Sequence, residues 1–147
     1  MADPKNRFED MIQKLRENGN RITPQRMAIV SILARSDNHP SAEQIHDQVK
    51  QDFPTMSLAT VYKNIELIKS LGEVLELGFP DGSNRYDGNR PTPHPHVICV
   101  RCRRIFDPDL DSLDLMQKEI ALETQFRILY HRLDFFGLCS DCAATEG

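Results

Sequence analysis

Residues 57–83 read SLATVYKNIELIKSLGEVLELGFPDGS, and the change of pattern within this stretch decides the fold of the N-terminal half. Its first part predicts a helix that ends near Gly72, because apolar residues recur every three or four positions at Leu58, Val61, Ile65 and Ile68. After Gly72 the period shortens to two over residues 75–79, which predicts a strand. The turn residues 80–83 and a returning strand at 84–87 complete a β-hairpin.

Three more helices are predicted before this stretch. Apolar spacing and capping residues place them within residues 1–18, at about 24–35, and between Ser41 and Phe53. The second of them is expected to bury Met27, Val30 and Leu33. Helices followed by a β-hairpin in this order are typical of a winged helix, a helix-turn-helix variant that binds DNA. Residues 1–88 are therefore predicted to form a winged-helix DNA-binding domain, to which the first helix is an N-terminal addition.

A domain boundary is expected where the sequence suits neither a helix nor a central strand. Residues 89–95 contain prolines at alternate positions and are interpreted as a linker. Beyond this linker, residues 96–147 predict a second domain with strands at 96–100 and 103–107, a helix at about 112–123 and a long strand at 126–136. The predicted fold class is α+β, with a winged helix followed by a small α/β domain.

The composition excludes several classes of protein. The chain has 147 residues, of which 39% are hydrophobic and 27% charged; this is typical of an ordered globular protein and too short for a large multidomain enzyme. No apolar run approaches the ~20 residues that cross a bilayer, and the first residues lack the features of a signal peptide. A cytoplasmic location is therefore expected.

Charge is distributed unevenly along the chain. The net charge of −4 by itself argues against DNA binding, because phosphate contacts need clustered basic residues. Residues 14–35, however, contain one acidic residue, Glu17, against the basic residues Lys14, Arg16, Arg21, Arg26 and Arg35. A solvated helix face explains this charge equally well, and it is the winged-helix order of elements that favours DNA.

The four cysteines form two C-x-x-C pairs, Cys99 with Cys102 and Cys139 with Cys142. Each pair can supply two thiolates to one tetrahedral metal ion, and four thiolates around Zn(II) are a common closed structural site. Disulfides or a redox-active pair are the alternatives, but a cytoplasmic chain disfavours disulfides and neither pair follows a strand into a helix. We therefore predict a structural zinc site.

Histidines and carboxylates form a second group of candidate ligands. His94 and His96 lie two positions apart, so an extended chain puts both imidazoles on one face, where they can chelate a metal. His39, Asp87 and Asp107 are polar residues near the ends of predicted elements, and spacing alone does not bring them to this pair. If all five converge, they form a nitrogen and oxygen site suited to Fe(II), Mn(II) or Zn(II).

Three runs of sequence resemble, in order and spacing, the ferric-uptake-regulator (Fur) family of metal-dependent repressors. They are residues 21–26 (RITPQR), 57–62 (SLATVY) and 94–102 (HPHVICVRC). The resemblance spans residues 21–142. Within the family the chain is most similar to the peroxide-sensing PerR branch, because Asp107 stands where the iron-uptake branch tends to carry Glu.

The resemblance implies a homodimer that binds double-stranded operator DNA through the winged helix and dimerises through residues 96–147. It assigns the structural Zn(II) site to Cys99, Cys102, Cys139 and Cys142, and a regulatory site for Fe(II) or Mn(II) to His39, Asp87, His94, His96 and Asp107. It further implies that hydrogen peroxide reacts at the bound Fe(II) and oxidises His39 or His94, after which metal and DNA are released. The residues expected to contact DNA are Lys14, Arg21, Arg26, Ser57, Thr60, Tyr62 and Lys63.

The leading hypothesis is therefore a peroxide-sensing transcriptional repressor and not an enzyme. One alternative is an iron- or zinc-responsive repressor of the same family, because the same five ligands accept several metals. A remote alternative is a metal-dependent hydrolase built on His94, His96 and a carboxylate, for which the sequence offers no separate general base. The family's additional metal site is expected to be absent, because Asp114 and His131 alone remain of its donors.

Overall fold

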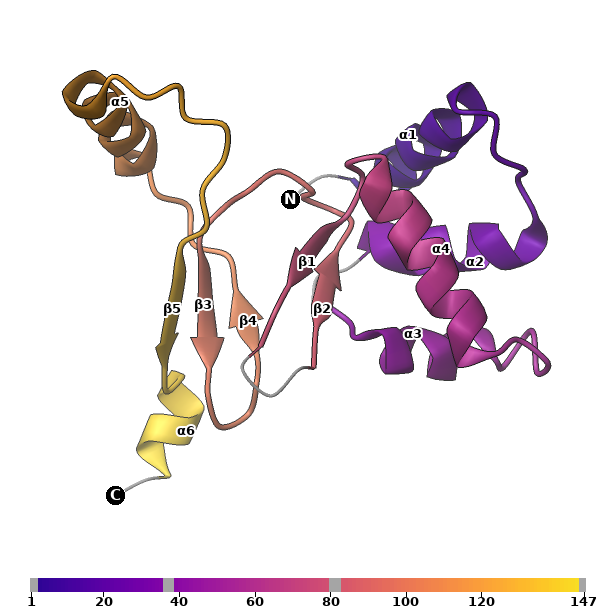
Figure 1. The fold of residues 1–147 in the computed structure, drawn as a ribbon. Helices are drawn as coiled ribbons and strands as arrows, with labels where there is room; N and C mark the ends of the chain where they lie inside the picture. The colour runs from indigo at the N-terminus through magenta and orange to yellow at the C-terminus, as the bar shows by residue number, and fades with distance from the viewer. Residues whose placement is uncertain (1–2, 36–38, 80–82, 146–147) are drawn as a thin grey trace. The chain divides into compact units, whose positions relative to one another are not determined.

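In the computed structural model, residues 3–35, 39–79 and 83–145 are described, and the chain divides into two compact units, Met1–Thr92 and Pro93–Gly147. The first unit contains α1 to α4 and the strands β1 and β2, and the second contains β3 to β5 with α5 and α6 (Figure 1). The elements are α1 (Pro4–Glu17), α2 (Pro24–Arg35), α3 (Ala42–Val49), α4 (Leu58–Ser70), β1 (Leu75–Leu77), β2 (Arg85–Asp87), β3 (His96–Cys99), β4 (Ile105–Phe106), α5 (Ser112–Thr124), β5 (Asp134–Gly137) and α6 (Ser140–Ala144).

The helices of the first unit begin where their capping residues predict. Ser41 and Gln44 form a capping box at the start of α3, in which each side chain accepts a hydrogen bond from the other residue's backbone N–H. The hydroxyls of Ser57 and Thr23 accept backbone N–H groups in the first turns of α4 and α2. β1 and β2 then pair antiparallel, which gives the predicted order of helices and hairpin. Residues 80–82 of the predicted turn lie outside the described residues.

Aliphatic side chains from α1 to α4 form the core of the first unit. Burial of each large side chain stabilises the fold by about 1.5–3 kcal/mol relative to an exposed one. The prediction that α2 buries Met27 is wrong, because Met27 is 40% exposed. The face of α2 that packs inward is formed by Ile29, Val30 and Leu33, so Met27 lies outside the core. The largest fully buried apolar side chains of this core are Met11, Leu15, Ile29, Leu33, Ile45, Ile65, Ile68, Val30 and Val61.

The chain that leaves the hairpin is bonded tightly to α1 and α2. Arg7 of α1 donates from Nε to the carbonyl of Gly88 at 2.8 Å. Gly88 lies so close to α2 that an added Cβ would meet the carbonyl oxygen of Leu33 at 2.7 Å, so a residue with a side chain does not fit without a shift of the backbone. The side chain of Asn89 donates to the carbonyl of Ala34 at 2.9 Å. Gly88 and Asn89 therefore pack with the helices of the first unit.

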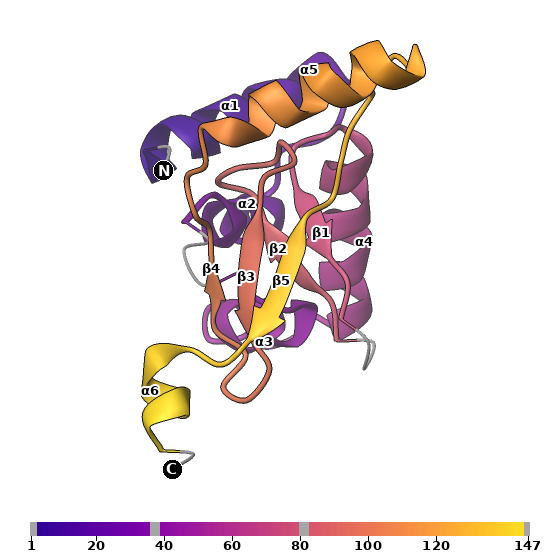
Figure 2. The ribbon, with the colours of Figure 1, turned by 90° about the vertical axis from the view of Figure 1, so that its left-hand side faces the viewer.

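The second unit is built on a three-stranded sheet in the order β4-β3-β5, drawn in Figure 2. β3 pairs antiparallel with β4 and parallel with β5, and α5 connects β4 to β5. The long strand predicted at 126–136 is wrong, because β5 comprises Asp134–Gly137 alone. Its partner β3 spans His96–Cys99, so the two strands pair over four residues each. Residues 125–133, which precede β5, form neither helix nor strand. None of the described helices is long and apolar enough to cross a membrane.

Candidate metal centres and DNA-binding surface

The four cysteines converge at the end of the second unit's sheet where β3 and β5 both end. Cys99 is the last residue of β3 and Cys139 follows β5, so the parallel pairing of these strands brings the two C-x-x-C pairs together. Their Sγ atoms lie within 4.8 Å of one another, and those of Cys102 and Cys139 are 3.8 Å apart. This separation is too long for a disulfide, whose sulfurs are about 2.05 Å apart. Four sulfurs at this spacing fit one tetrahedral metal ion.

Hydrogen bonds at this cluster favour thiolates, the form of cysteine that binds metal. The backbone N–H groups of Cys139 and Cys102 each lie 3.5 Å from Sγ of Cys99 and lower the pKa of that thiol to about 5. Arg104 donates to Sγ of Cys102 at 3.3 Å and to Sγ of Cys139 at 3.5 Å, which lowers the pKa of Cys102. Arg104 also pairs with Asp141 at 2.8 Å.

Cys142 behaves in the opposite way from Cys99. Its hydrogen bond with Cys139 raises the pKa of Cys142 to about 12, so the protein alone does not ionise all four thiols near neutral pH. A bound cation removes this obstacle, because it offsets the negative charge of the thiolates. The donor set therefore fits a divalent metal with soft ligands, as Zn(II) sites of this type require.

A second donor group in the second unit consists of His94, His96 and Asp107. Nε2 of His94 lies 3.3 Å from Oδ2 of Asp107, and Nε2 of His96 lies 3.7 Å from Oδ1 of the same carboxylate. His96 belongs to β3, and Asp107 directly follows β4, the antiparallel neighbour of β3. The two imidazole rings are 4.4 Å apart between centroids. Two imidazole nitrogens thus face one carboxylate, an arrangement typical of transition-metal sites with nitrogen and oxygen ligands.

The first unit contributes a separate pair, His39 and Asp87. Nε2 of His39 lies 3.2 Å from Oδ2 of Asp87, and both side chains are buried. Oδ1 of Asp87 accepts the backbone N–H groups of Asn89 and Arg90, each at 2.9 Å, so the carboxylate is held with its second oxygen toward the imidazole. His39 precedes α3 with a φ of 51°, and its carbonyl accepts a hydrogen bond from Arg85. Each predicted ligand is therefore close to at least one other predicted ligand of its own unit.

α4 presents the residues predicted to meet DNA bases on its exposed face. This helix buries Val61, Asn64, Ile65 and Ile68, and leaves Tyr62 and Lys63 exposed. The hydroxyl of Tyr62 donates to Oε1 of Glu43 on α3 at 3.0 Å, and this hydrogen bond raises the pKa of Tyr62. Ser57 and Thr60, also predicted DNA contacts, lie with their hydroxyl oxygens 3.0 Å apart at the start of α4.

Among the predicted phosphate contacts, Arg26 is largely engaged within the first unit. Its Nε donates to Oδ1 of Asn64 at 2.8 Å and its Nη1 donates to the carbonyl of Arg21 at 2.6 Å. Arg26 thereby connects α2 to α4 and stabilises their packing. Arg21 is exposed and Lys14 half-buried on α1, so both can still reach solvent.

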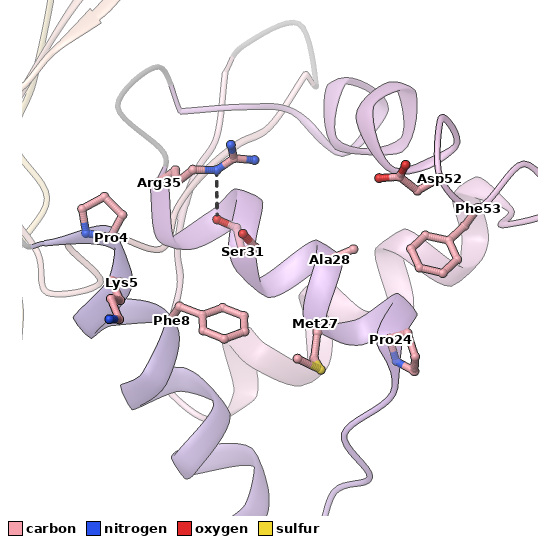
Figure 3. Close-up of a pocket in the computed structure, with 10 residues that line it drawn as sticks. All are labelled: Pro4, Lys5, Phe8, Pro24, Met27, Ala28, Ser31, Arg35, Asp52 and Phe53. Carbon is pink, nitrogen blue, oxygen red and sulfur yellow. Dashed lines mark hydrogen bonds between the residues drawn. The ribbon is translucent and has the colours of Figure 1, made fainter.

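A groove of about 640 Å³ on the first unit contains none of the predicted site residues (Figure 3). It lies between α1, α2 and the segment after α3, with Phe8, Met27 and Phe53 along its apolar wall. Arg35 stands at its rim and donates from Nε to the carbonyl of Ser31. The groove leaves Met27 accessible, which agrees with the exposure of that side chain.

The sequence analysis missed several residues that contact predicted site residues. Among them are Glu43 beside Tyr62, Arg104 beside the thiols, and Asp134, whose Oδ1 lies 3.3 Å from Nδ1 of His96. Of these, Arg104 could have been identified from the sequence, because it is a basic residue two positions after the candidate ligand Cys102. The other two contacts depend on how α3 packs beside α4 and on the register of β5, which no local pattern reveals.

Comparison with known proteins decides the family. The model of the ferric uptake regulator family matches residues 17–136. The chain belongs to the ferric uptake regulator family. Among curated relatives, the peroxide-responsive repressor PerR of Staphylococcus saprophyticus is 42% identical over 138 residues, which cover 92% of this chain and 90% of that protein. The resemblance found in the sequence is therefore confirmed.

Solved structures of this family share the fold. The ferric uptake regulator Fur of Helicobacter pylori, described as having three functional metal binding sites, superposes with a TM-score of 0.83 at 24% identity and covers 99% of this chain and 97% of its own. PerR of Streptococcus pyogenes, whose structure concerns peroxide sensing and gene regulation, gives a TM-score of 0.53 at 34% identity, with 92% of both chains covered. The predicted α+β fold with an N-terminal winged helix is confirmed.

Proposed function

We propose that this member of the ferric uptake regulator family is a homodimeric repressor that binds operator DNA when a regulatory metal is bound, and releases it when hydrogen peroxide oxidises a ligand histidine. The observation that carries this proposal is the donor group of His94, His96 and Asp107, in which two imidazole Nε2 atoms face one carboxylate. The relative at 42% identity is named as a peroxide-responsive repressor, which supports a regulatory function and not an enzymatic one.

One metal ion would bind both His94, His96 and Asp107 of the second unit and His39 and Asp87 of the first. Fe(II) binds to two imidazoles and one carboxylate and then has further coordination positions open. His39 and Asp87 would add one nitrogen and one oxygen ligand at such positions. Imidazole and carboxylate donors accept Fe(II), Mn(II) or Zn(II), and Fe(II) or Mn(II) is the regulatory ion of this proposal. An ion shared in this way stabilises one arrangement of the two units, and DNA affinity then depends on metal occupancy.

The four cysteines would hold a structural Zn(II) ion. Their spacing, the lowered pKa of Cys99 and the cation of Arg104 all favour a site of thiolates. Bound there, Zn(II) supplies no redox chemistry and joins the end of β3 to the segment around α6. The role of this ion is therefore to stabilise the second unit.

The apolar surface of the second unit supports dimerisation. α5 has no buried residue, and Leu115, Leu122 and Leu129 are 69%, 76% and 77% exposed. Phe135 and Phe136 of β5 are about half exposed, and β5 is an edge strand of its sheet. Exposed apolar patches next to an unpaired strand edge mark interaction surfaces. A second copy of this chain is the partner that would cover them.

Mass spectrometry of the Fe(II)-loaded protein after treatment with hydrogen peroxide tests the sensing step. We expect peptides containing His39 or His94 to gain the mass of one oxygen atom, because a bound Fe(II) would give an electron to hydrogen peroxide next to these two ligands. The Mn(II)-loaded protein is the control and is expected to gain no oxygen, since Mn(II) gives up an electron to peroxide far less readily. If neither histidine is modified while operator binding still requires metal, the protein is an iron- or zinc-responsive repressor instead.

Lys63→Ala is expected to relax base preference. Lys63 is exposed on α4 beside Tyr62, where a direct contact to a base edge contributes about 1–3 kcal/mol of discrimination. Competition binding with the operator and with versions substituted at single base pairs measures this loss. Lys69→Ala is the matched control, because Lys69 lies in the last turn of the same helix and pairs with Glu76. Unchanged discrimination by Lys63→Ala, or an equal loss for all sequences, contradicts a base contact.

A further inference from the structure

We propose that Asp134 positions His96 for metal binding: its carboxylate accepts a hydrogen bond from the Nδ1–H group of His96, so that the Nε2 atom remains as the ligand. This inference rests on the proposed function, because it deepens the role of one ligand of the regulatory site. Asp134 would not itself bind the metal. It would act through His96, as a positioning residue.

The geometry of the sheet creates this contact. β3 and β5 are parallel neighbours, and their register places His96 directly opposite Asp134. Oδ1 of Asp134 lies 3.3 Å from Nδ1 of His96, whereas Nε2 of the same ring faces Oδ1 of Asp107 at 3.7 Å. The shorter distance is near the limit of a hydrogen bond and the longer one is beyond it. The two nitrogens of His96 therefore face two different carboxylates, and Asp134 is the better acceptor.

Two further contacts hold Asp134 in this position. Nη2 of Arg132 donates to Oδ2 of Asp134 at 2.9 Å, which leaves Oδ1 directed at the imidazole. The backbone N–H of His96 donates to the carbonyl of Leu133 at 3.0 Å, next to Asp134 in the chain. The side chains of His96 and Asp134 are 2% and 15% exposed, so water competes weakly for this contact. The carboxylate is thus oriented by contacts within the second unit.

The orientation of the Asp134 carboxylate determines which nitrogen of the His96 ring can bind a metal. A neutral imidazole carries one proton, and the nitrogen that carries it cannot bind a metal. A carboxylate at Nδ1 selects the form in which Nε2 is free to coordinate, fixes the plane of the ring and increases the basicity of the ligand nitrogen. Loss of such a partner typically weakens metal affinity by about 10–100-fold. Asp134 would therefore set how tightly the regulatory metal binds.

The first test is made on the wild-type protein loaded with zinc but not with regulatory metal. Long-range ¹H–¹⁵N correlation NMR distinguishes the two neutral forms of a histidine ring. We expect the proton of His96 to lie on Nδ1 in the wild type, and to distribute between both nitrogens in Asp134→Ala. A wild-type His96 with its proton on Nε2 overturns the proposal, whatever the metal affinity. The wild-type part of this measurement does not depend on the stability of any variant.

The second test is calorimetric titration with Mn(II). We expect Asp134→Ala to bind Mn(II) about 10–100-fold more weakly than the wild type, and Asp134→Glu to recover part of the loss. Zinc content and the midpoint of thermal unfolding check that the variants are folded. Asp111→Ala is the matched control, because Asp111 precedes α5 and its side chain makes no cap hydrogen bond. Equal Mn(II) affinity of Asp134→Ala and wild type overturns the proposal.

The two tests separate this proposal from the proposed function. If His96→Ala leaves Mn(II) affinity unchanged, His96 is not a ligand, and it is the proposed regulatory site that fails. The NMR measurement would then still report whether Asp134 selects the form of the His96 ring. If His96→Ala loses Mn(II) but Asp134→Ala does not, the regulatory site stands and the positioning role is wrong.

Discussion

Cys139→Ala is expected to unfold the second unit, because it lowers the stability of that unit by several kcal/mol. In the described part of this unit, the buried hydrophobic residues are Ile98, Cys99 and Ile105, so its core is too small to offset the loss of chain entropy. Binding of structural Zn(II) contributes about 10–16 kcal/mol in small zinc domains, and three remaining thiolates retain a fraction of this. Circular dichroism during heating, together with elemental analysis of zinc per chain, measures the effect.

The matched control for this prediction is Ser140→Ala, which changes the adjacent residue and leaves all four thiols in place. We expect it to retain one zinc ion per chain and the wild-type unfolding curve. A Cys139→Ala protein that unfolds at the wild-type temperature contradicts the structural role of the cluster. Retention of zinc with a lower midpoint would mean that three thiolates suffice to bind the ion but not to stabilise the fold.

Removal of the His39 imidazole is expected to abolish the stimulation of operator binding by metal, without unfolding the protein. His39 is absent from the apolar core of the first unit, and its proposed role is to join that unit to the regulatory ion. We expect an increase of at least about 10-fold in operator affinity on adding Mn(II) to the wild type, which corresponds to the usual range of coupling free energies. Fluorescence anisotropy of labelled operator with and without Mn(II) measures this difference.

His39→Asn is a better variant than His39→Ala, because His39 has a positive φ and asparagine tolerates that conformation at lower cost. His46→Ala serves as the control. This histidine lies on α3 of the same unit, and its Nε2 contacts the carbonyl of Met56 at 2.8 Å, outside the donor groups. Metal stimulation that persists in His39→Asn removes His39 from the regulatory site; loss in both variants points to a general effect on the fold.

The helices of the first unit could be predicted because their signals are local. Ser41 and Ser57 each accept a backbone N–H within the next three residues, and this short range is visible in the sequence. Met27 could not be predicted in the same way. Its spacing fits an apolar face of α2, but whether other helices cover that face depends on tertiary packing. The strand predicted at 126–136 failed for a similar reason, since the short β3 limits the length of its partner.

The candidate sites differ in the same way: the cysteine pairs are local in the sequence, whereas the other contacts depend on the folded structure. The spacing within each C-x-x-C pair was enough to predict the zinc cluster, because each pair is local and one metal ion needs both. The closeness of His39 to Asp87, by contrast, requires β2 to end beside the segment before α3, which only the folded unit reveals. The contact of Asp134 with His96 could not be predicted from the sequence, because only the parallel register of β3 and β5 places the two residues opposite each other.

The tight packing around Gly88 has a mechanical consequence for the first unit. Gly88 lies against the backbone of α2, Arg7 of α1 bonds its carbonyl, and Asn89 bonds the carbonyl of Ala34 at the end of α2. Asp87 is the residue immediately before these contacts. The position of the Asp87 carboxylate is therefore coupled to α1 and α2 through the two residues that follow it. A ligand that held this carboxylate would also act on the position of these helices.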